Sequence, residues 1–429
     1  MYSIIIALIL LMFLAYRGMS ILWIAPICAL IVALGGGVAL LPAYTDTYMA
    51  GFVGFTRSWF PVFMLGAIFG KIMEVSGGAQ SVAHFITHLI GKKQAILAVM
   101  LGCIVLAYGG VSIFVVAFAM YPLAYAVFRE ANITRKLIPG TLACGMFTLA
   151  MTALPGTPQI QNIIPTRYFG TLPTAAPITG LLASLAMGVG GYLFLVWRES
   201  CYRKKGEFFE ESKTNRVVEV DAKTLPNPYL SFIPLAAVVI VLNVLDRPII
   251  VALLSGIVLA IMLNYVSLRG RLISVLNEGA ANSIIAIINT SAAVGFGAMV
   301  RAVPGFKQLT DLVLGIEGNP LISLGVAVNV LAGATGSASG GLGIALEALG
   351  AKYVELAAAS GISLESFHRV ASIGSGGLDS LPHNGAILTV LAIVGMTHKD
   401  SYYEMFITTV MIPVLATVIA IITGSLGIL

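Results

Sequence analysis

The stretch Leu154-Pro155-Gly156-Thr157-Pro158-Gln159 breaks a long apolar region of the chain, and Leu381-Pro382-His383-Asn384 breaks another one 227 residues later. The same offset carries Phe69-Gly70 onto Phe296-Gly297 and Gly78 onto Gly305. It also places the apolar segments 3–16, 21–41 and 177–197 on segments that begin at 230, 248 and close to 404. Many secondary transporters are duplicated apolar chains that hold their substrate where the two halves meet. The sequence therefore predicts two repeats, residues 1–197 and 229–429, joined by a linker over residues 198–228.

The composition indicates an integral membrane protein. Hydrophobic residues make up 58% of the 429 residues, charged residues make up 10%, and the mean hydropathy is +0.97. Several continuous apolar runs, among them 21–41 and 177–197, reach the roughly 20 residues that a helix needs to cross a hydrocarbon core. These runs lack the period of two that is typical of outer-membrane barrel strands. We therefore expect an all-α polytopic membrane protein with about ten to twelve membrane segments.

The positions of the basic residues predict that the two halves are inverted. Seven Lys and Arg residues lie in the stretch 198–227, which the positive-inside rule places in the cytoplasm. From there the chain crosses outward through 230–245, turns at Asp246-Arg247 and returns toward Arg269 and Arg271. The matching pair of segments in the first half turns at Arg17, a basic residue that belongs inside. The halves then enter the bilayer in opposite senses, and both termini lie outside. The acidic residues of 207–211 are interpreted as part of a solvated linker.

Four polar interruptions in the apolar segments predict where a substrate binds. They are YGGVS at 108–112, LPGTPQ at 154–159, GATGSASGG at 333–341 and GSGGLDSLPHNG at 374–385. Gly and Pro free backbone N–H and C=O groups, which is tolerable at membrane depth only where protein or a water-filled cavity satisfies them. Broken helices and re-entrant hairpins in corresponding positions of two halves indicate a site near the bilayer midplane. Helix N-termini created by such breaks favour an anionic substrate.

Side chains at these breaks supply the candidate substrate-binding residues. An alternative for 333–341 is close helix packing through small residues, and a single Pro is usually only a kink. The binding interpretation is favoured because the breaks at Pro155 and Pro382 occupy equivalent positions, and polar side chains follow both. The predicted substrate-binding residues are Gly110, Ser112, Thr157, Gln159, Ser337, Ser339, Gly340, His383 and Asn384.

Ionisable residues inside apolar stretches are the candidates for ion coupling. Lys71 and Glu74 are three positions apart, so we expect them to form a structural ion pair on one helix face. Asp379 and His383 lie in the last break, where a carboxylate or an imidazole can change protonation between two access states. The structural alternatives are a helix N-cap for Asp379 and a hydrogen-bonded loop residue for His383.

Through these stretches the chain resembles the gluconate permease family of proton symporters, within the larger ion transporter superfamily. The resemblance rests on GAIFGKIMEVSGGAQ at 66–80 together with the breaks at 154–159, 333–341 and 374–385, in this order and spacing. It implies a homodimeric symporter of the bacterial inner (plasma) membrane that carries a small organic monocarboxylate with protons, without cofactors or nucleic acid. It also implies an elevator mechanism, with a scaffold of about 1–50, 177–266 and 402–429 and a transport domain of about 55–175 and 275–400.

The chain differs from the family pattern at two of the breaks. Gluconate permeases carry an acidic residue in the first break, whereas 108–112 has no carboxylate here. The segment at 154–162, LPGTPQIQN, is also poorer in His and Pro than its counterparts. A less polar pocket suits a smaller anion such as 3-hydroxybutyrate better than gluconate. Coupling to Na⁺ is the alternative, as in citrate-like anion or dicarboxylate transporters of the superfamily, with Thr335, Ser337 and Ser339 as ligands.

Other classes fit the sequence less well. A channel is disfavoured because no ring of charged residues is visible. A hydrolase built from Asp379, Ser380 and His383 is disfavoured because these residues lie too close together on one loop to adopt triad geometry. The four cysteines, Cys28, Cys103, Cys144 and Cys201, show no ligand-like spacing, so neither disulfides nor a metal site are expected.

Overall fold

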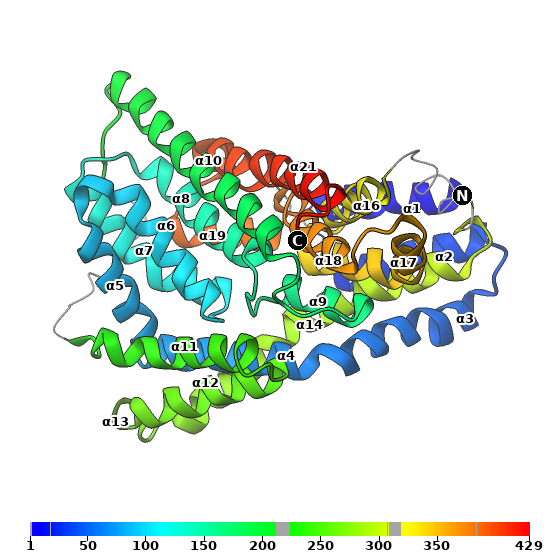
Figure 1. Ribbon diagram of the computed structural model, residues 1–429, viewed down its shortest axis with the longest axis horizontal. Helices are drawn as coiled ribbons and strands as arrows, with labels where there is room; N and C mark the ends of the chain where they lie inside the picture. The colour runs from blue at the N-terminus through cyan, green and yellow to red at the C-terminus, as the bar shows by residue number, and fades with distance from the viewer. Residues whose placement is uncertain (1, 18, 212–223, 307, 309–318, 383) are drawn as a thin grey trace.

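The structure is a computed structural model that describes the chain apart from residues 1, 18, 212–223, 307, 309–318 and 383. All regular elements in this described part are helical (Figure 1). The first half contains α1 (Tyr2–Tyr16), α2 (Ile21–Gly35), α3 (Leu40–Pro42), α4 (Met49–Val75), α5 (Gly78–Ile90), α6 (Ala95–Tyr108), α7 (Ile113–Glu130), α8 (Ile138–Met146), α9 (Ile160–Phe169) and α10 (Pro177–Lys204). The second half contains α11 (Pro228–Asn243), α12 (Ile249–Leu263), α13 (Tyr265–Leu268), α14 (Leu272–Ala302), α16 (Pro320–Thr335), α17 (Ala338–Ser360), α18 (Leu364–Ser375), α19 (Gly385–Val394), α20 (His398–Phe406) and α21 (Ile412–Ser425).

The helices have the length and apolarity of membrane spans, which confirms a polytopic membrane protein. Within the described residues, five helical stretches are long and apolar enough to cross a bilayer: Leu40–Val75, Arg135–Ala153, Pro177–Lys204, Leu272–Ala302 and His398–Ser425. Two further pairs pass this test together but are sharply bent, Gly78–Ile90 with Lys92–Tyr108 by 97° and Leu364–Ser380 with Gly385–Val394 by 56°. Five shorter apolar helices of 10–17 residues complete the set.

The two halves are interlocked. The long helices α4 and α14, one from each half, pack along each other through the molecule. The first-half helix α2 packs on α14, while the second-half helix α12 packs on α4. In the same way α9 packs against α17 and α18, whereas α19 packs against α7 and α8 (Figure 1). Each half therefore completes its bundle with helices from the other half.

Glycines at the chain breaks adopt backbone conformations, or allow close approaches, that other residues do not. Gly110, Gly156 and Gly336 have φ values of +90°, +77° and +59°, a left-handed conformation that side chains disfavour. Gly341 serves packing instead, because a Cβ atom at this position would lie 2.1 Å from the backbone nitrogen of Ala332. The helices α16 and α17 thus touch backbone to backbone, so close packing explains this one glycine of the 333–341 segment.

The predicted linker is more ordered at its start than expected. Helix α10 continues to Lys204, inside the stretch 198–228. Beyond it the chain folds back on basic residues of the first half, since Glu207 Oε2 lies 2.5 Å from Lys136 Nζ and Glu211 Oε1 lies 3.9 Å from Arg129 Nη1. The segment 207–211 is mostly exposed, as expected of a solvated linker, and two of its carboxylates also have cationic partners on the folded body.

Candidate functional site

The two breaks of the first half lie against each other. The Gln159 amide, at the start of α9, donates from Nε2 to the carbonyls of Ala107 at 2.6 Å and Val111 at 3.3 Å. The Tyr108 hydroxyl donates to the carbonyl of Pro155 at 2.9 Å. These bonds tie the end of α6 and the turn after it to the segment that precedes α9. The segments 108–112 and 154–159 therefore form one polar region, and its contact with substrate stays a prediction.

The predicted site residues of this region mainly brace the backbone. Thr157 is fully buried and donates from its hydroxyl to the carbonyl of Ala150 at 2.7 Å. Ser112 directly precedes α7 without a side-chain cap bond, and Gly110 supplies the left-handed turn before it. A contact of these groups with substrate stays a prediction.

The two breaks of the second half are also adjacent. The Asn329 side chain on α16 accepts from the backbone N–H of Leu378 through Oδ1 at 3.3 Å. A Cβ atom on Gly333 would lie 2.8 Å from Leu378 Cβ, so only glycine permits this approach. The segment 333–341 thus lies on the segment 374–385.

A cluster of hydroxyl groups marks the start of α17. Ser337 caps this helix by accepting from Gly340 N–H at 3.1 Å. Its Oγ lies 3.5 Å from Ser339 Oγ, which in turn lies 3.3 Å from Thr290 Oγ1 on α14. Thr335 donates to the carbonyl of Ser337 at 3.1 Å. Thr335, Ser337 and Ser339 therefore lie in one cluster, and their role in binding Na⁺ or substrate stays a prediction.

Asn384 holds the last break together. It caps α19 by accepting from the N–H groups of Ala386 at 2.6 Å and Ile387 at 2.9 Å, and it donates to the carbonyl of Asp379 at 2.9 Å. Asp379 is only 4% exposed, and its Oδ1 accepts from the Ser380 hydroxyl at 3.2 Å. Asp379 was expected, as a structural alternative, to be a helix N-cap. The residue that caps α19 is Asn384. His383 lies outside the described residues.

The two pairs of breaks meet at Thr152. Its carbonyl accepts from the Ser372 hydroxyl on α18 at 2.7 Å. A Cβ atom on Gly376 would lie 2.8 Å from Thr152 Cγ2, so the two chains are in direct contact. The two halves are therefore in direct contact beside the break at 154–159 and at the start of the break at 374–385.

A buried arginine beside this junction was missed by the sequence reasoning. Arg369 on α18 has no exposed surface, and its guanidinium donates only to neutral oxygens of the first half. These are the carbonyls of Ala175 at 2.6 Å and 3.0 Å, Pro173 at 3.2 Å and Ala153 at 3.4 Å, and Oδ1 of Asn162 at 2.8 Å. Within the described residues it makes no ion pair with a carboxylate.

The neighbour of Arg369 completes a buried polar network. His368 has no exposed surface and lies 2.7 Å from the Thr171 hydroxyl through Nδ1 and 3.2 Å from Asn162 Oδ1 through Nε2. Glu365, one turn earlier, accepts from the backbone N–H of Ala176 at 2.8 Å. The run Phe367-His368-Arg369-Val370 was a usable signal, since two adjacent ionisable residues flanked by apolar ones are costly to bury.

Known proteins place the chain among transporters. The family described as "GntP family permease" matches residues 1–300. The chain is 41% identical over 447 aligned positions to "Uncharacterized transporter YxjC" of Bacillus subtilis (strain 168), covering 95% of both chains. It is 24% identical to an "Uncharacterized permease" of Haemophilus influenzae, over 75% of this chain and 71% of that protein.

Among solved structures, the fold resembles the Alcanivorax borkumensis YdaH transporter, described as having an unusual topology. The TM-score is 0.55 at 16% sequence identity, covering 91% of this chain and 88% of that one. Together with the apolar helices, these similarities show a multi-pass protein of the cell membrane that acts as a secondary transporter rather than an enzyme. The chain belongs to the GntP permease family.

Proposed function

We propose that this transporter carries a small hydroxy-monocarboxylate, of the size of 3-hydroxybutyrate, together with protons. Family membership supports a small organic anion as the transported molecule. The coupling ion and the identity of the anion are inferred from the residues at the junction of the four breaks.

The observation that carries the anion proposal is the burial of Arg369. Its positive charge lies beside the break at 154–159, and its hydrogen bonds go to neutral oxygens rather than to a carboxylate. Glu365, one turn earlier on α18, is the carboxylate that acts on Arg369 without a direct hydrogen bond, and a buried cation bonded only to neutral oxygens favours a further negative charge nearby. The start of α9, which follows the break at 154–159, adds the positive end of a helix dipole on the same side.

The proposed preference for a small anion follows from the groups around the junction. The first break carries no carboxylate, and Gln159 and Thr157 already spend their hydrogen-bond donors on backbone carbonyls. Few free donors then remain for a substrate with many hydroxyl groups. A short acid with one hydroxyl group fits this supply better than gluconate does.

Asp379 is the proposed proton carrier, with His383 as the second candidate. Asp379 is buried next to the helix start of α19, and its Oδ1 accepts from the Ser380 hydroxyl. Among the described residues it forms no ion pair, and a buried carboxylate of this kind is costly when charged, so binding a proton relieves that cost. Coupling to Na⁺ is the second candidate, because Thr335, Ser337, Ser339 and Thr290 gather hydroxyl oxygens around the start of α17.

An elevator movement of residues 55–175 and 275–400 against a dimeric scaffold is proposed as the mechanism. The contact between α11, a proposed scaffold helix, and the first-half breaks supports it. Leu235 and Val238 pack against Gly109 and Gly110, and the Asn243 amide donates to the carbonyl of Gly156 at 2.9 Å. The breaks present glycines to α11, and a surface without side chains offers little resistance to sliding.

Counterflow with purified protein tests the substrate without assuming a coupling ion. Proteoliposomes loaded with unlabelled 3-hydroxybutyrate are diluted into labelled 3-hydroxybutyrate, and butyrate, gluconate and citrate compete in separate reactions. We expect exchange that 3-hydroxybutyrate and butyrate inhibit more strongly than gluconate or citrate. Exchange inhibited best by citrate would replace the proposal with the dicarboxylate alternative.

A further inference from the structure

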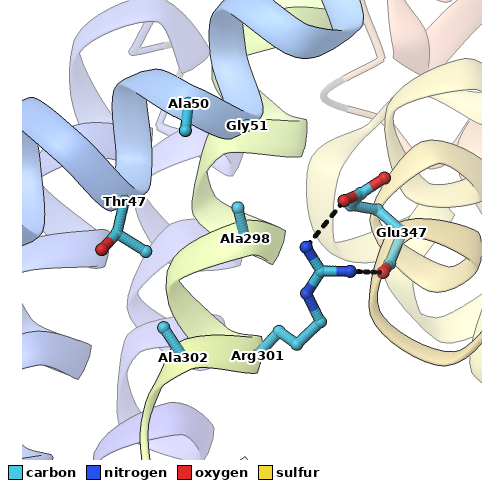
Figure 2. A pocket seen from close by; sticks show the side chains of 7 residues that line it. All are labelled: Thr47, Ala50, Gly51, Ala298, Arg301, Ala302 and Glu347. Carbon is cyan, nitrogen blue, oxygen red and sulfur yellow. Dashed lines mark hydrogen bonds and ion pairs between the residues drawn. The ribbon is translucent and has the colours of Figure 1, made fainter.

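A polar hollow lies away from the broken helices, at the C-terminal end of α14. It has a volume of about 290 Å³, near the lower end of the ~300–1,000 Å³ typical of ligand sites. Figure 2 shows its lining: Thr47, Ala50 and Gly51 from the start of α4 and the turn before it, Ala298, Arg301 and Ala302 from α14, and Glu347 from α17. Small side chains form most of the wall, and Arg301 and Glu347 supply the charge.

Arg301 and Glu347 form an ion pair at the edge of the hollow. Arg301 Nη2 lies 2.9 Å from Glu347 Oε1, and Nη1 donates to the Glu347 carbonyl at 2.9 Å (Figure 2). The other carboxylate oxygen of Glu347 accepts from the Tyr168 hydroxyl at 3.0 Å. The Arg301 side chain is half exposed, so the outer edge of its guanidinium still faces open space.

The 227-residue offset relates the residues of this hollow to residues at the opposite end of the α4 and α14 pair. We call that opposite end, around Lys71, Glu74 and Glu278, the template. Arg301 corresponds to Glu74, Ala298 to Lys71 and Gly51 to Glu278. In the template, Lys71 Nζ lies 3.3 Å from Glu74 and 3.2 Å from Glu278, which confirms the expected Lys71 and Glu74 pair and adds a second carboxylate.

The template also contains a hydroxyl donor to that second carboxylate. Ser274, the counterpart of Thr47, donates to Glu278 Oε1 at 3.0 Å. One end of the helix pair therefore holds one cation, two carboxylates and a hydroxyl group. At the other end, the described residues that line the hollow include one cation, Arg301, one carboxylate, Glu347, and one hydroxyl-bearing residue, Thr47, while Gly51 occupies the position that corresponds to Glu278.

We propose that the hollow binds a small carboxylate, which takes the place that Glu278 fills at the other end. Its carboxylate receives hydrogen bonds from the exposed part of the Arg301 guanidinium. The ligand then pairs with Arg301 as Glu278 pairs with Lys71 at the other end. The site is distinct from the broken helices and does not depend on which anion is transported.

A cysteine at the rim reports occupancy directly. Ala50 is exposed and lines the hollow, so Ala50→Cys in a Cys201→Ser background places a reactive thiol there, while Cys28, Cys103 and Cys144 are buried. The rate of maleimide labelling is measured with increasing acetate or 3-hydroxybutyrate. Neutral 1,3-butanediol and chloride are the controls. We expect the two carboxylates, and neither control, to slow labelling.

Two substitutions remove the site in different ways. Arg301→Gln deletes the charged donor and should raise the half-protecting concentration about tenfold or more, the range of a lost charge-assisted hydrogen bond. Ala302→Glu supplies a tethered carboxylate and should abolish protection, whereas Ala302→Gln should not. Lys352→Gln removes an exposed cation that pairs with Glu355 on α17 and serves as the matched control for Arg301.

Asn384→Ala separates this site from the transport site. Protection that persists in Asn384→Ala supports local binding at the hollow. Protection that is lost in Asn384→Ala but kept in Arg301→Gln would mean that the signal comes from the broken helices, and the proposal would fail. Labelling rates that no carboxylate changes would also overturn it.

Discussion

Arg369 on α18 donates a 2.8 Å hydrogen bond from Nη1 to Asn162 Oδ1 on α9, and so joins a helix of the second half to a helix of the first. Both residues are fully buried, and the same guanidinium also bonds to carbonyls on either side of α9. The break at 154–159 is therefore positioned by a cation from the opposite half. The residue that joins the two halves is therefore also the cation that we propose attracts the anionic substrate.

Replacing Arg369 separates its charge from its packing role. Arg369→Lys keeps the charge and should keep substrate affinity. Arg369→Gln loses the charge and should weaken carboxylate affinity about tenfold or more. Both should lower the unfolding temperature, because buried carbonyls lose donors. Affinity is measured by counterflow in proteoliposomes and stability by thermal unfolding in detergent.

Arg167→Gln is the control for Arg369, since Arg167 is an exposed cation on α9. It should change neither affinity nor unfolding temperature. Equal affinity in Arg369→Lys and Arg369→Gln would show that the positive charge does not select the anion.

Asn384→Ala should reduce uptake while leaving expression intact. The substitution removes the cap of α19 and the bond to Asp379, at a cost of about 0.5–2 kcal/mol in stability. Asn319→Ala removes a comparable cap, that of α16, away from the breaks. The two variants should lose similar stability, whereas only Asn384→Ala should lose uptake. If the two variants took up substrate at the same rate, the substrate-binding site would not include the start of α19.

Asp379→Asn should uncouple transport from protons. The amide has nearly the same shape as the carboxylate but takes up no proton near neutral pH. The variant should therefore exchange substrate without accumulating it. Counterflow and proton-driven uptake are compared in the same proteoliposomes. Asp46→Asn, at an exposed carboxylate, should keep both activities. Full proton-driven accumulation by Asp379→Asn would leave His383 or the substrate as the proton carrier.

A cross-link between α11 and the first break should stop an elevator. A Cβ atom on Gly109 would lie 2.8 Å from Leu235 Cβ, so Gly109→Cys with Leu235→Cys requires a shift of about 1 Å to reach disulfide geometry. Oxidation of the double variant in the Cys201→Ser background should block uptake, and reduction should restore it. Each single variant should be insensitive to oxidant. Full uptake by quantitatively cross-linked protein would mean that these helices do not separate.

The sequence was sufficient for the features that depend on local chemistry. Apolar runs predicted the membrane helices, and Gly and Pro marked the breaks at 108–112, 154–159, 333–341 and 374–385, all of which lie at or between helix ends. The pair of Lys71 and Glu74 followed from helical spacing. These predictions need only the nearest neighbours in the chain.

The parts that were missed depend on contacts between distant residues. Arg369 and His368 follow the polar start of α18, and they become buried only because α9 and the loop 170–176 cover them. The hollow at Arg301 exists because α4, α14 and α17 meet beside Gly51 and Ala298, two residues whose effect is visible only in three dimensions. The polar stretch 207–211 gained its partners in the same way.

Uptake of labelled 3-hydroxybutyrate into proteoliposomes shows whether this transporter couples a small hydroxy acid to protons. The purified wild-type protein is given an inward proton gradient, an inward Na⁺ gradient or neither. The account predicts accumulation above the external concentration with the proton gradient alone. Accumulation that requires Na⁺ would contradict the proposed coupling, and no accumulation of this acid under any gradient would contradict the proposed substrate.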